Sequence, residues 1–329
     1  MISIVSNNQI VNLLILLPYT FGVRAHSLLY PELYQVSDND SFFAHWFFSR
    51  LGENAWWHSI VATLLIYSIA VLIGFLSNKY RLFQRSNLFA PYFFVLLASL
   101  IGEVQMLSPV IIALLFFALY LRSCLMIYRY HLSAFEIFNV GLFAMLAGLI
   151  YPPLLMLIFA SFFVIFFFEG VNIKAFLLLI LGMISVTIIV YSIFYFFGVS
   201  TTTEGKIFGI SKVLTDANYW TFNRILYSGV VIFLVLFGMS RYYNFLKKKI
   251  IDARKRITFL FLTTILMLLI PLFYVGTDIH FLLILSLMGS FFAAFYFDGR
   301  RNNFLVESVH LILLIMLFGF QFNLINILF

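Results

Sequence analysis

Long apolar runs recur along the whole sequence, and they restrict the possible fold more than any other feature. Two clear examples are His58 to Ser77 and Ile279 to Phe297. A helix needs about 20 apolar residues to cross the hydrocarbon core of a bilayer. A bilayer core holds no water to pair with backbone amides, so a run of this kind folds as a helix. The sequence therefore predicts an all-α fold, a polytopic bundle of transmembrane helices.

The composition argues against a water-soluble protein. Of the 329 residues, 64% are hydrophobic and 10% are charged, whereas soluble domains are about 45–50% apolar and about 25% charged. The formal charge of +7 does not indicate nucleic-acid binding, because the basic residues lie at the ends of apolar runs, where they contact anionic headgroups. We therefore expect membrane lipids as partners and no nucleic acid. A single cysteine, Cys124, excludes an internal disulfide and a cysteine-based metal site.

Eleven candidate spans follow from the positions of the apolar runs. They are Ile10–Val23, His58–Ser77, Leu88–Leu107, Val110–Tyr128, Phe135–Tyr151, Leu154–Phe168, Ala175–Gly198, Ile225–Ser240, Ile257–Val275, Ile279–Phe297 and Val306–Phe329. Pro152 and Pro153 separate the fifth and sixth spans, since proline cannot continue a helical hydrogen-bond ladder. These two segments are either full spans or a re-entrant pair. We treat residues 1–329 as one integral membrane domain.

The basic segment 241–256, called the hinge below, sets the predicted orientation. It holds seven Lys/Arg residues and one acid, Asp252. Short loops rich in Lys and Arg stay on the cytoplasmic side. With the hinge inside, 15 of the 20 Lys/Arg residues are cytoplasmic, which places the N-terminus inside and the C-terminus outside. Segments 24–57 and 199–224 are then external. We expect a multi-pass protein of a bacterial cytoplasmic (inner) membrane.

The first external segment, 24–57, offers the most candidate chemistry. Asp38 and Asp40 are two residues apart, a spacing that suits a divalent cation or a general base. Ser41 is a good N-cap for a helix lying in the membrane interface over residues 41–57. The aspartates would lie at the positive end of that helix, so a purely structural role is the alternative.

Glu103 is the most informative single residue. It lies inside the third predicted span, where an ionisable side chain is costly and indicates a functional site. It is also about 6 Å below the turn at Pro109, so contact with external water is the alternative. Asp38, Asp40 and Glu103 are therefore the candidate catalytic residues.

No specific catalytic, metal-binding or cofactor-binding motif accompanies these residues. The sequence has no metalloprotease helix, nucleophile elbow or phosphate-binding glycine loop. His280 and Asp278, at the external end of the tenth span, are weaker candidates. The sequence leaves open whether the protein is an enzyme, and it assigns no metal or cofactor.

Three stretches carry a family resemblance. They are LSPVIIALLFFALYLRSCLMI, AFEIFNVGLFAMLAGLIYPPLLMLIFASFFVIFF and NIKAFLLLILGMISV, about a third of the chain. With them the chain resembles a family of uncharacterised polytopic inner-membrane proteins of Bacteroidota, whose members often carry the name beta-carotene monooxygenase. Such oxygenases need clustered histidines for non-haem iron, and the six histidines here are scattered along the sequence.

A more distant similarity links the acidic first external loop and its interfacial helix to multi-span lipid-linked glycosyltransferases. Three functional hypotheses follow. The first is a membrane subunit of cell-envelope biogenesis with other envelope proteins as partners. The second is a glycosyltransferase that acts on a lipid-linked substrate at the external face, with Asp38 or Asp40 as base or metal ligand and Glu103 as a second polar group. The third is a transporter, although the sequence shows no clear midplane polar site or internal repeat.

Overall fold

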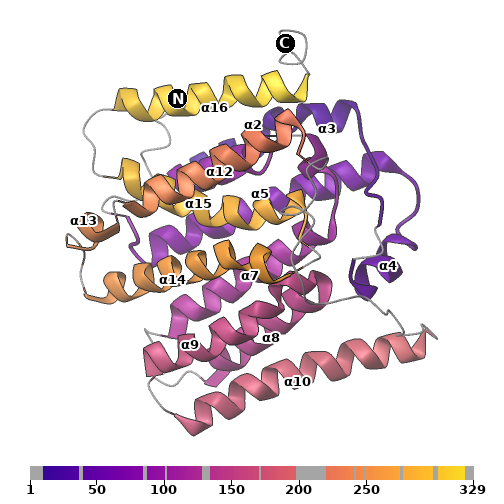
Figure 1. Cartoon of the computed structure of the whole chain (residues 1–329), viewed down its shortest axis with the longest axis vertical. Helices are drawn as coiled ribbons and strands as arrows, with labels where there is room; N and C mark the ends of the chain where they lie inside the picture. Colours follow the sequence, from indigo (N-terminus) through magenta and orange to yellow (C-terminus); the bar gives the residue numbers. More distant parts are fainter. Residues whose placement is uncertain are drawn as a thin grey trace.

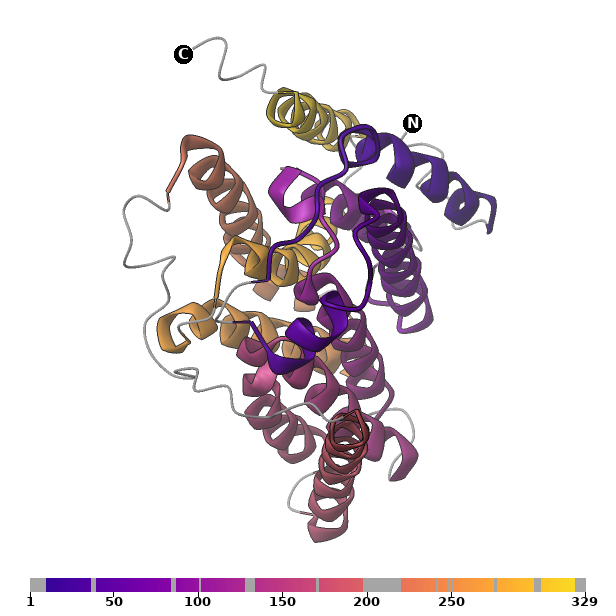
Figure 2. The same cartoon turned by 90° about the vertical axis from the view of Figure 1, so that its right-hand side faces the viewer.

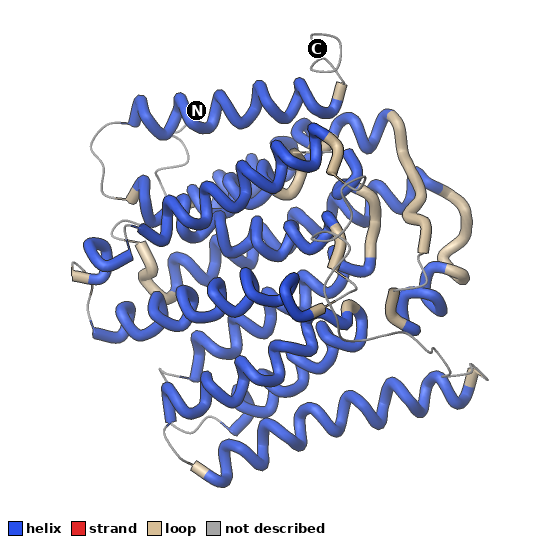
Figure 3. Tube along the Cα trace, viewed as in Figure 1, coloured by secondary structure: helices blue, strands red, loops and turns tan. Residues whose placement is uncertain are grey.

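The structure, a computed structural model, contains helices and no strand in the residues that it describes (Figure 3). The all-α prediction is confirmed for this part of the chain. The described residues are 10–36, 40–83, 87–100, 102–127, 134–169, 172–197, 220–240, 242–247, 249, 251–274, 277–298 and 303–322.

Six helical segments are long and apolar enough to cross a membrane. They are α5 (Ala55–Lys79), α7 (Pro109–Ile127), α10 (Ile173–Phe196), α12 (Phe222–Ser240), α14 (Ile251–Phe273) and the continuous pair η4 (Ile279–Phe281) and α15 (Leu282–Phe297). Their length and composition indicate a membrane protein. The count of eleven spans, the sidedness of the termini and the kind of membrane stay predictions.

Shorter helices complete the described fold. They are α2 (Ile10–Val23), α3 (Ala25–Leu29), α4 (Phe42–Phe48), α6 (Phe89–Leu97), η1 (Gly102–Gln105), α8 (Ala134–Ile150), η2 (Pro152–Met156), α9 (Leu157–Glu169), α13 (Tyr242–Leu246) and α16 (Asn303–Gln321). The first predicted span has the bounds of α2. The predicted break at Pro152 is also confirmed, because α8 ends before it and η2 begins there.

The longer helices run side by side, and their ends form the two ends of a bundle (Figure 1). One end, called the η1 end, carries α3, α4, η1 and η4, and the chain through α3 and α4 crosses it (Figure 2). The opposite end, called the hinge end, carries α13 and the start of α14. The helix α15 lies at the centre of the bundle and packs against α6, α7, α12 and α14.

The third predicted span is not one continuous helix. Its helical part, α6, ends at Leu97, and a turn leads to η1. The freed Ser99 carbonyl accepts hydrogen bonds from the side-chain amides of Gln105 at 2.7 Å and Gln321 at 2.8 Å. Side chains thus replace the helical partner that the backbone carbonyl loses, which permits a break inside an apolar region.

The hinge is partly helical, since α13 lies within it and α14 begins at Ile251 rather than at Ile257. Arg256 is buried, where its Nε donates to the Leu125 carbonyl at 3.2 Å and its guanidinium lies 4.7 Å from the centre of the Tyr80 ring. One basic side chain of the hinge therefore fixes α14 to the ends of α7 and α5, while others remain at the surface.

Two glycines bring α8 and α10 into direct backbone contact. A Cβ atom at Gly141 would lie 2.2 Å from the Leu179 carbonyl oxygen, and one at Gly182 would lie 2.2 Å from the Phe138 carbonyl oxygen. Small residues let membrane helices approach closely, and van der Waals packing then holds them together. This contact matters because α10 lies at the margin of the bundle and most of its apolar surface is exposed (Figure 1).

Gly141→Ala and Gly182→Ala should each destabilise the protein by about 1–3 kcal/mol, because the added methyl group overlaps a backbone carbonyl that cannot rotate away. Thermal unfolding in detergent measures the effect. Gly229→Ala on α12 is the matched control, since nothing lies within 4 Å of a Cβ there. Equal midpoints for the Gly141→Ala and Gly229→Ala proteins would contradict the close contact.

A buried ion pair links the hinge to the end of α15. Lys249 Nζ lies 3.8 Å from Asp298 Oδ2, and both side chains are buried. Burial lowers the pKa of the Lys249 ammonium to about 8, although the charge of Asp298 acts to raise it. Between pH 8 and the ordinary lysine pKa of 10.5 the folded state binds fewer protons than the unfolded state. The contribution of Lys249 to stability therefore rises with pH in that window.

Asp298→Asn should lower the free energy of unfolding most below pH 8, where Lys249 is charged and needs its partner. The difference from the wild type should shrink as the pH rises above 8, because a neutral amine gains nothing from a carboxylate. Thermal unfolding between about pH 6 and pH 10 checks this. The exposed Asp252→Asn is the control, and a pH-independent deficit in Asp298→Asn would refute the assignment.

Candidate functional site

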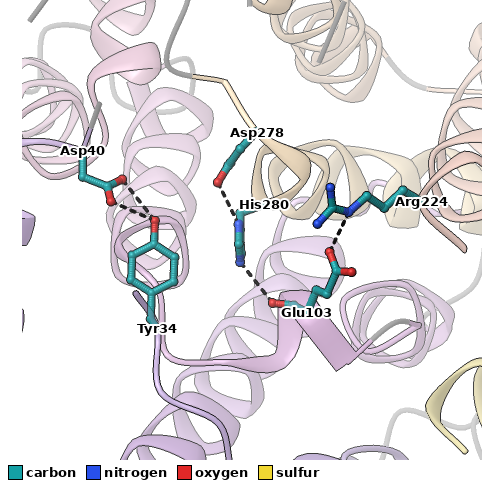
Figure 4. Close-up of polar contacts among 6 residues, drawn as sticks. All are labelled: Tyr34, Asp40, Glu103, Arg224, Asp278 and His280. Carbon is teal, nitrogen blue, oxygen red and sulfur yellow. Dashed lines mark hydrogen bonds and ion pairs between the residues drawn. The ribbon is translucent and has the colours of Figure 1, made fainter. Parts of the chain in front are cut away.

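Polar side chains from four distant parts of the chain meet at the η1 end (Figure 4). Arg224 Nε, in the first turn of α12, donates to Glu103 Oε2 at 2.8 Å. His280 Nε2 lies 3.0 Å from the Glu103 backbone carbonyl, and His280 Nδ1 lies 2.8 Å from Asp278 Oδ2. A continuous series of contacts therefore runs from Asp278 through His280 and η1 to Arg224.

Both ring nitrogens of His280 face hydrogen-bond acceptors. A neutral imidazole donates from one nitrogen only, so donation to both the carbonyl and an ionised Asp278 requires the doubly protonated ring. The ring is largely buried, which strengthens these hydrogen bonds and makes their loss costly. His280 therefore holds η4 against η1 and fixes the backbone of Glu103.

Glu103 lies in η1, beyond the end of α6, rather than in a transmembrane helix as the sequence predicted. Its side chain is 41% exposed, and that of Arg224 is 24% exposed. An ion pair with this much solvent contact contributes about 0–1 kcal/mol to stability. The pair therefore orients the carboxylate more than it stabilises the fold.

Of the two candidate aspartates of segment 24–57, the structure describes Asp40, and Asp40 stands apart from Glu103. Asp38 lies outside the described residues. Both carboxylate oxygens of Asp40 lie 3.1 Å from the Tyr34 hydroxyl, and the Tyr34 ring contacts His280 edge to face at 5.5 Å between centroids. Asp40 and Glu103 thus flank His280 on opposite sides (Figure 4). The catalytic roles predicted for these residues stay predictions.

The predicted interfacial helix is shorter than residues 41–57. Ser41 caps α4 as predicted, with its Oγ accepting from the Ala44 amide at 3.1 Å. The helix ends at Phe48, because the chain turns through Gly52 at φ +80°, a conformation that favours glycine. Asn54 then caps α5.

A polar pocket of about 170 Å³ opens beside Glu103, and we call it the η1 pocket. Its lining is His26, Ser27, Tyr30, Glu32, Ser59, Gly102, Glu103, Met106, Asn223, Phe320 and Gln321. Two carboxylates, two amides and three hydroxyls belong to the residues that line this small space. Of the three candidate residues from the sequence, Glu103 contributes to this lining.

The sequence did not identify Arg24 as a buried residue. It follows α2 and is 0% exposed. Its Nε donates to Thr63 Oγ1 at 3.2 Å and its Nη2 donates to the Gln105 carbonyl. The predicted loop position suggested a solvated charge. The partners that allow Arg24 to be buried, Thr63 and Gln105, lie far away in the sequence. A single sequence does not reveal that they are close to Arg24 in space.

Within the described residues, no group of three or more His, Cys, Asp or Glu side chains is placed to hold a metal ion. Asp38 is outside that search. The arrangement that the structure does contain is a carboxylate fixed by an arginine at the edge of a polar pocket. This geometry suits hydrogen bonding to a hydroxyl or amine of a ligand.

His280→Gln should cost about 1–3 kcal/mol of stability, since it removes a buried donor from Asp278 or from the Glu103 carbonyl. Arg224→Gln should cost less than about 1 kcal/mol, because its ion pair is partly exposed. Thermal or denaturant unfolding in detergent ranks the two variants. The reverse order would show that the Glu103–Arg224 pair, rather than His280, holds this end together.

Comparison with known proteins identifies the family to which the chain belongs. No curated protein and no solved structure matches the chain. A family of unknown function, DUF6427, matches residues 41–328. That range includes Glu103, Arg224, Asp278 and His280, and it begins at the N-cap of α4. Since the match spans most of the sequence, the chain belongs to the DUF6427 family of proteins of unknown function.

Proposed function

We propose that this protein is a membrane subunit that serves cell-envelope biogenesis in a bacterial inner membrane. There it binds the polar headgroup of a lipid-linked substrate. The η1 pocket is the observation that carries the proposal. It places a concentrated set of polar groups at the end of an otherwise apolar bundle. Ligand sites commonly combine a few convergent polar groups with a preformed hollow.

The lining suits a ligand rich in hydroxyl or amine groups. Glu32 and Glu103 accept hydrogen bonds, and the amide of Asn223 can both donate and accept. The Gln321 Nε2 already donates to the Val23 and Ser99 carbonyls, so its Oε1 adds an acceptor. Tyr30 adds an aromatic ring on which a sugar or an apolar part of the ligand can pack. The volume restricts the bound part to about the size of one small headgroup.

The surroundings favour a ligand that is attached to the membrane. Trp56 and Trp57 in the first turn of α5 are 53% and 64% exposed at this end of the bundle. Tryptophan is enriched where a membrane meets water. A headgroup at this level would leave its lipid tail in the bilayer.

A glycosyltransferase is the second candidate, and the position of Glu103 favours it. A general base must lie within hydrogen-bond reach of the hydroxyl that it deprotonates. Glu103 lines the pocket and is held by Arg224, whereas Asp40 is bound to Tyr34 outside the pocket lining. If the protein is a transferase, Glu103 is therefore the better candidate base.

Glu103→Gln should weaken headgroup binding about tenfold or more, because a hydrogen bond to a charged acceptor contributes about 1.5–3 kcal/mol. The protein is purified in lipid nanodiscs, and glucose, N-acetylglucosamine, glycerol and ethanolamine serve as soluble probes. Ligand-dependent thermal stabilisation reports binding, since a ligand at 100 times its Kd stabilises by about 2.7 kcal/mol. Mass spectrometry of copurified lipids identifies the natural headgroup.

Glu53→Gln is the matched control, because it makes the same change at an exposed glutamate that does not line the pocket. Stabilisation by a probe in the wild type and in Glu53→Gln, but not in Glu103→Gln, supports the proposal. No probe effect and unchanged copurified lipids in Glu103→Gln would overturn it. A Glu103→Gln protein that still binds a lipid-linked sugar but no longer transfers the sugar would favour the transferase.

A further inference from the structure

An apolar groove lies between α9 and α14, and it shares no lining residue with the η1 pocket. Its lining is Ala160, Phe163, Val164, Phe259, Leu262, Thr263 and Leu266, and its volume is about 230 Å³. The Thr263 hydroxyl donates within its own helix, to the carbonyls of Phe259 at 3.1 Å and Leu260 at 2.9 Å. The hydroxyl of the one polar side chain in the lining therefore already has hydrogen-bond acceptors, and the surface of the groove is apolar.

The groove opens on the exposed, apolar side of the helix pair. Phe163 at its margin is 71% exposed, and Phe159 and Phe166 continue the same exposed face of α9. Ala160 is the smallest residue of the lining, and its short side chain leaves space between the two helices. In a bilayer, hydrocarbon is the material that would fill such a space.

The basic hinge supplies charge at one end of this groove. Lys255 precedes Phe259, Leu262 and Leu266 by four, seven and eleven residues, so helical periodicity puts all four on one face of α14. Lys255 lies about 6 Å along the helix axis from Phe259. The acid Asp252 is exposed one turn earlier on α14. Basic residues nonetheless dominate the hinge, which attracts anionic headgroups.

We propose that the α9–α14 groove holds one acyl chain of an anionic phospholipid whose phosphate contacts Lys255. The chain lies along Phe259, Leu262 and Leu266, against Ala160 of α9. The phosphate remains at the hinge end, where it interacts with the lysine ammonium. The lipid then fills the space between two helices whose direct contact is limited.

Native mass spectrometry of the full-length protein tests this site. The protein is mixed with phosphatidylglycerol or with phosphatidylcholine of the same acyl chains, and retained lipids are counted. The wild type should retain one phosphatidylglycerol in preference to phosphatidylcholine. Lys255→Gln should weaken phosphatidylglycerol binding about fivefold, the effect of one lysine near an anionic surface. Lys247→Gln, an equal charge change elsewhere in the hinge, should change binding less than twofold.

A groove-filling variant tests the acyl chain separately. Ala160→Phe should abolish retention of the lipid, whereas Leu181→Phe on the exposed face of α10 should not. If Ala160→Phe fails to fold, Lys255→Gln still decides the question, because its side chain is outside the packed lining. Equal retention of both lipids with no effect of Lys255→Gln would overturn the proposal and indicate ordinary annular lipid. Lipid retained by a folded Ala160→Phe protein would also overturn it.

Discussion

The pairing of backbone polar groups is the constraint on which this structure depends. In an apolar solvent an unpaired amide or carbonyl costs several kcal/mol, so helices are the default and every interruption needs a replacement partner. The interruptions occur at the η1 end. The Ser99 carbonyl is paired by Gln105 and Gln321, the Gln105 carbonyl by Arg24, and the Glu103 carbonyl by His280. The candidate site therefore lies where the helical ladder is broken.

This coupling explains why structural and candidate functional residues are neighbours. His280 supports the fold, and in doing so it positions the backbone that carries Glu103. The carboxylate of Glu103 is left partly exposed beside a polar pocket, held by an arginine whose ion pair adds little stability. The buried group thus provides rigidity, and the partly exposed carboxylate is accessible from the pocket.

The parts of the fold that could be predicted from sequence depend on local signals. Apolar length identified α2 and α5, Pro152 marked the start of η2, and Ser41 signalled the cap of α4. The break after α6 could not be predicted, because one of the two side chains that pair the Ser99 carbonyl, Gln321, is 222 residues away. The two members of the Glu103–Arg224 pair are 121 residues apart. Glu103 was found because a charge in an apolar run is conspicuous, but its pocket is assembled from segments whose proximity a single sequence does not encode.

The double hydrogen bond to the Ser99 carbonyl has a consequence for biosynthesis. Gln321 is separated from Ser99 by 222 residues, so α16 is made long after α6. At about 5–20 residues per second, roughly 10–40 s pass between the two during translation. Throughout that interval the bend after α6 has Gln105 but lacks its second glutamine. The polar interior of this end therefore stays incomplete until α16 has been made and Gln321 has packed against the bend.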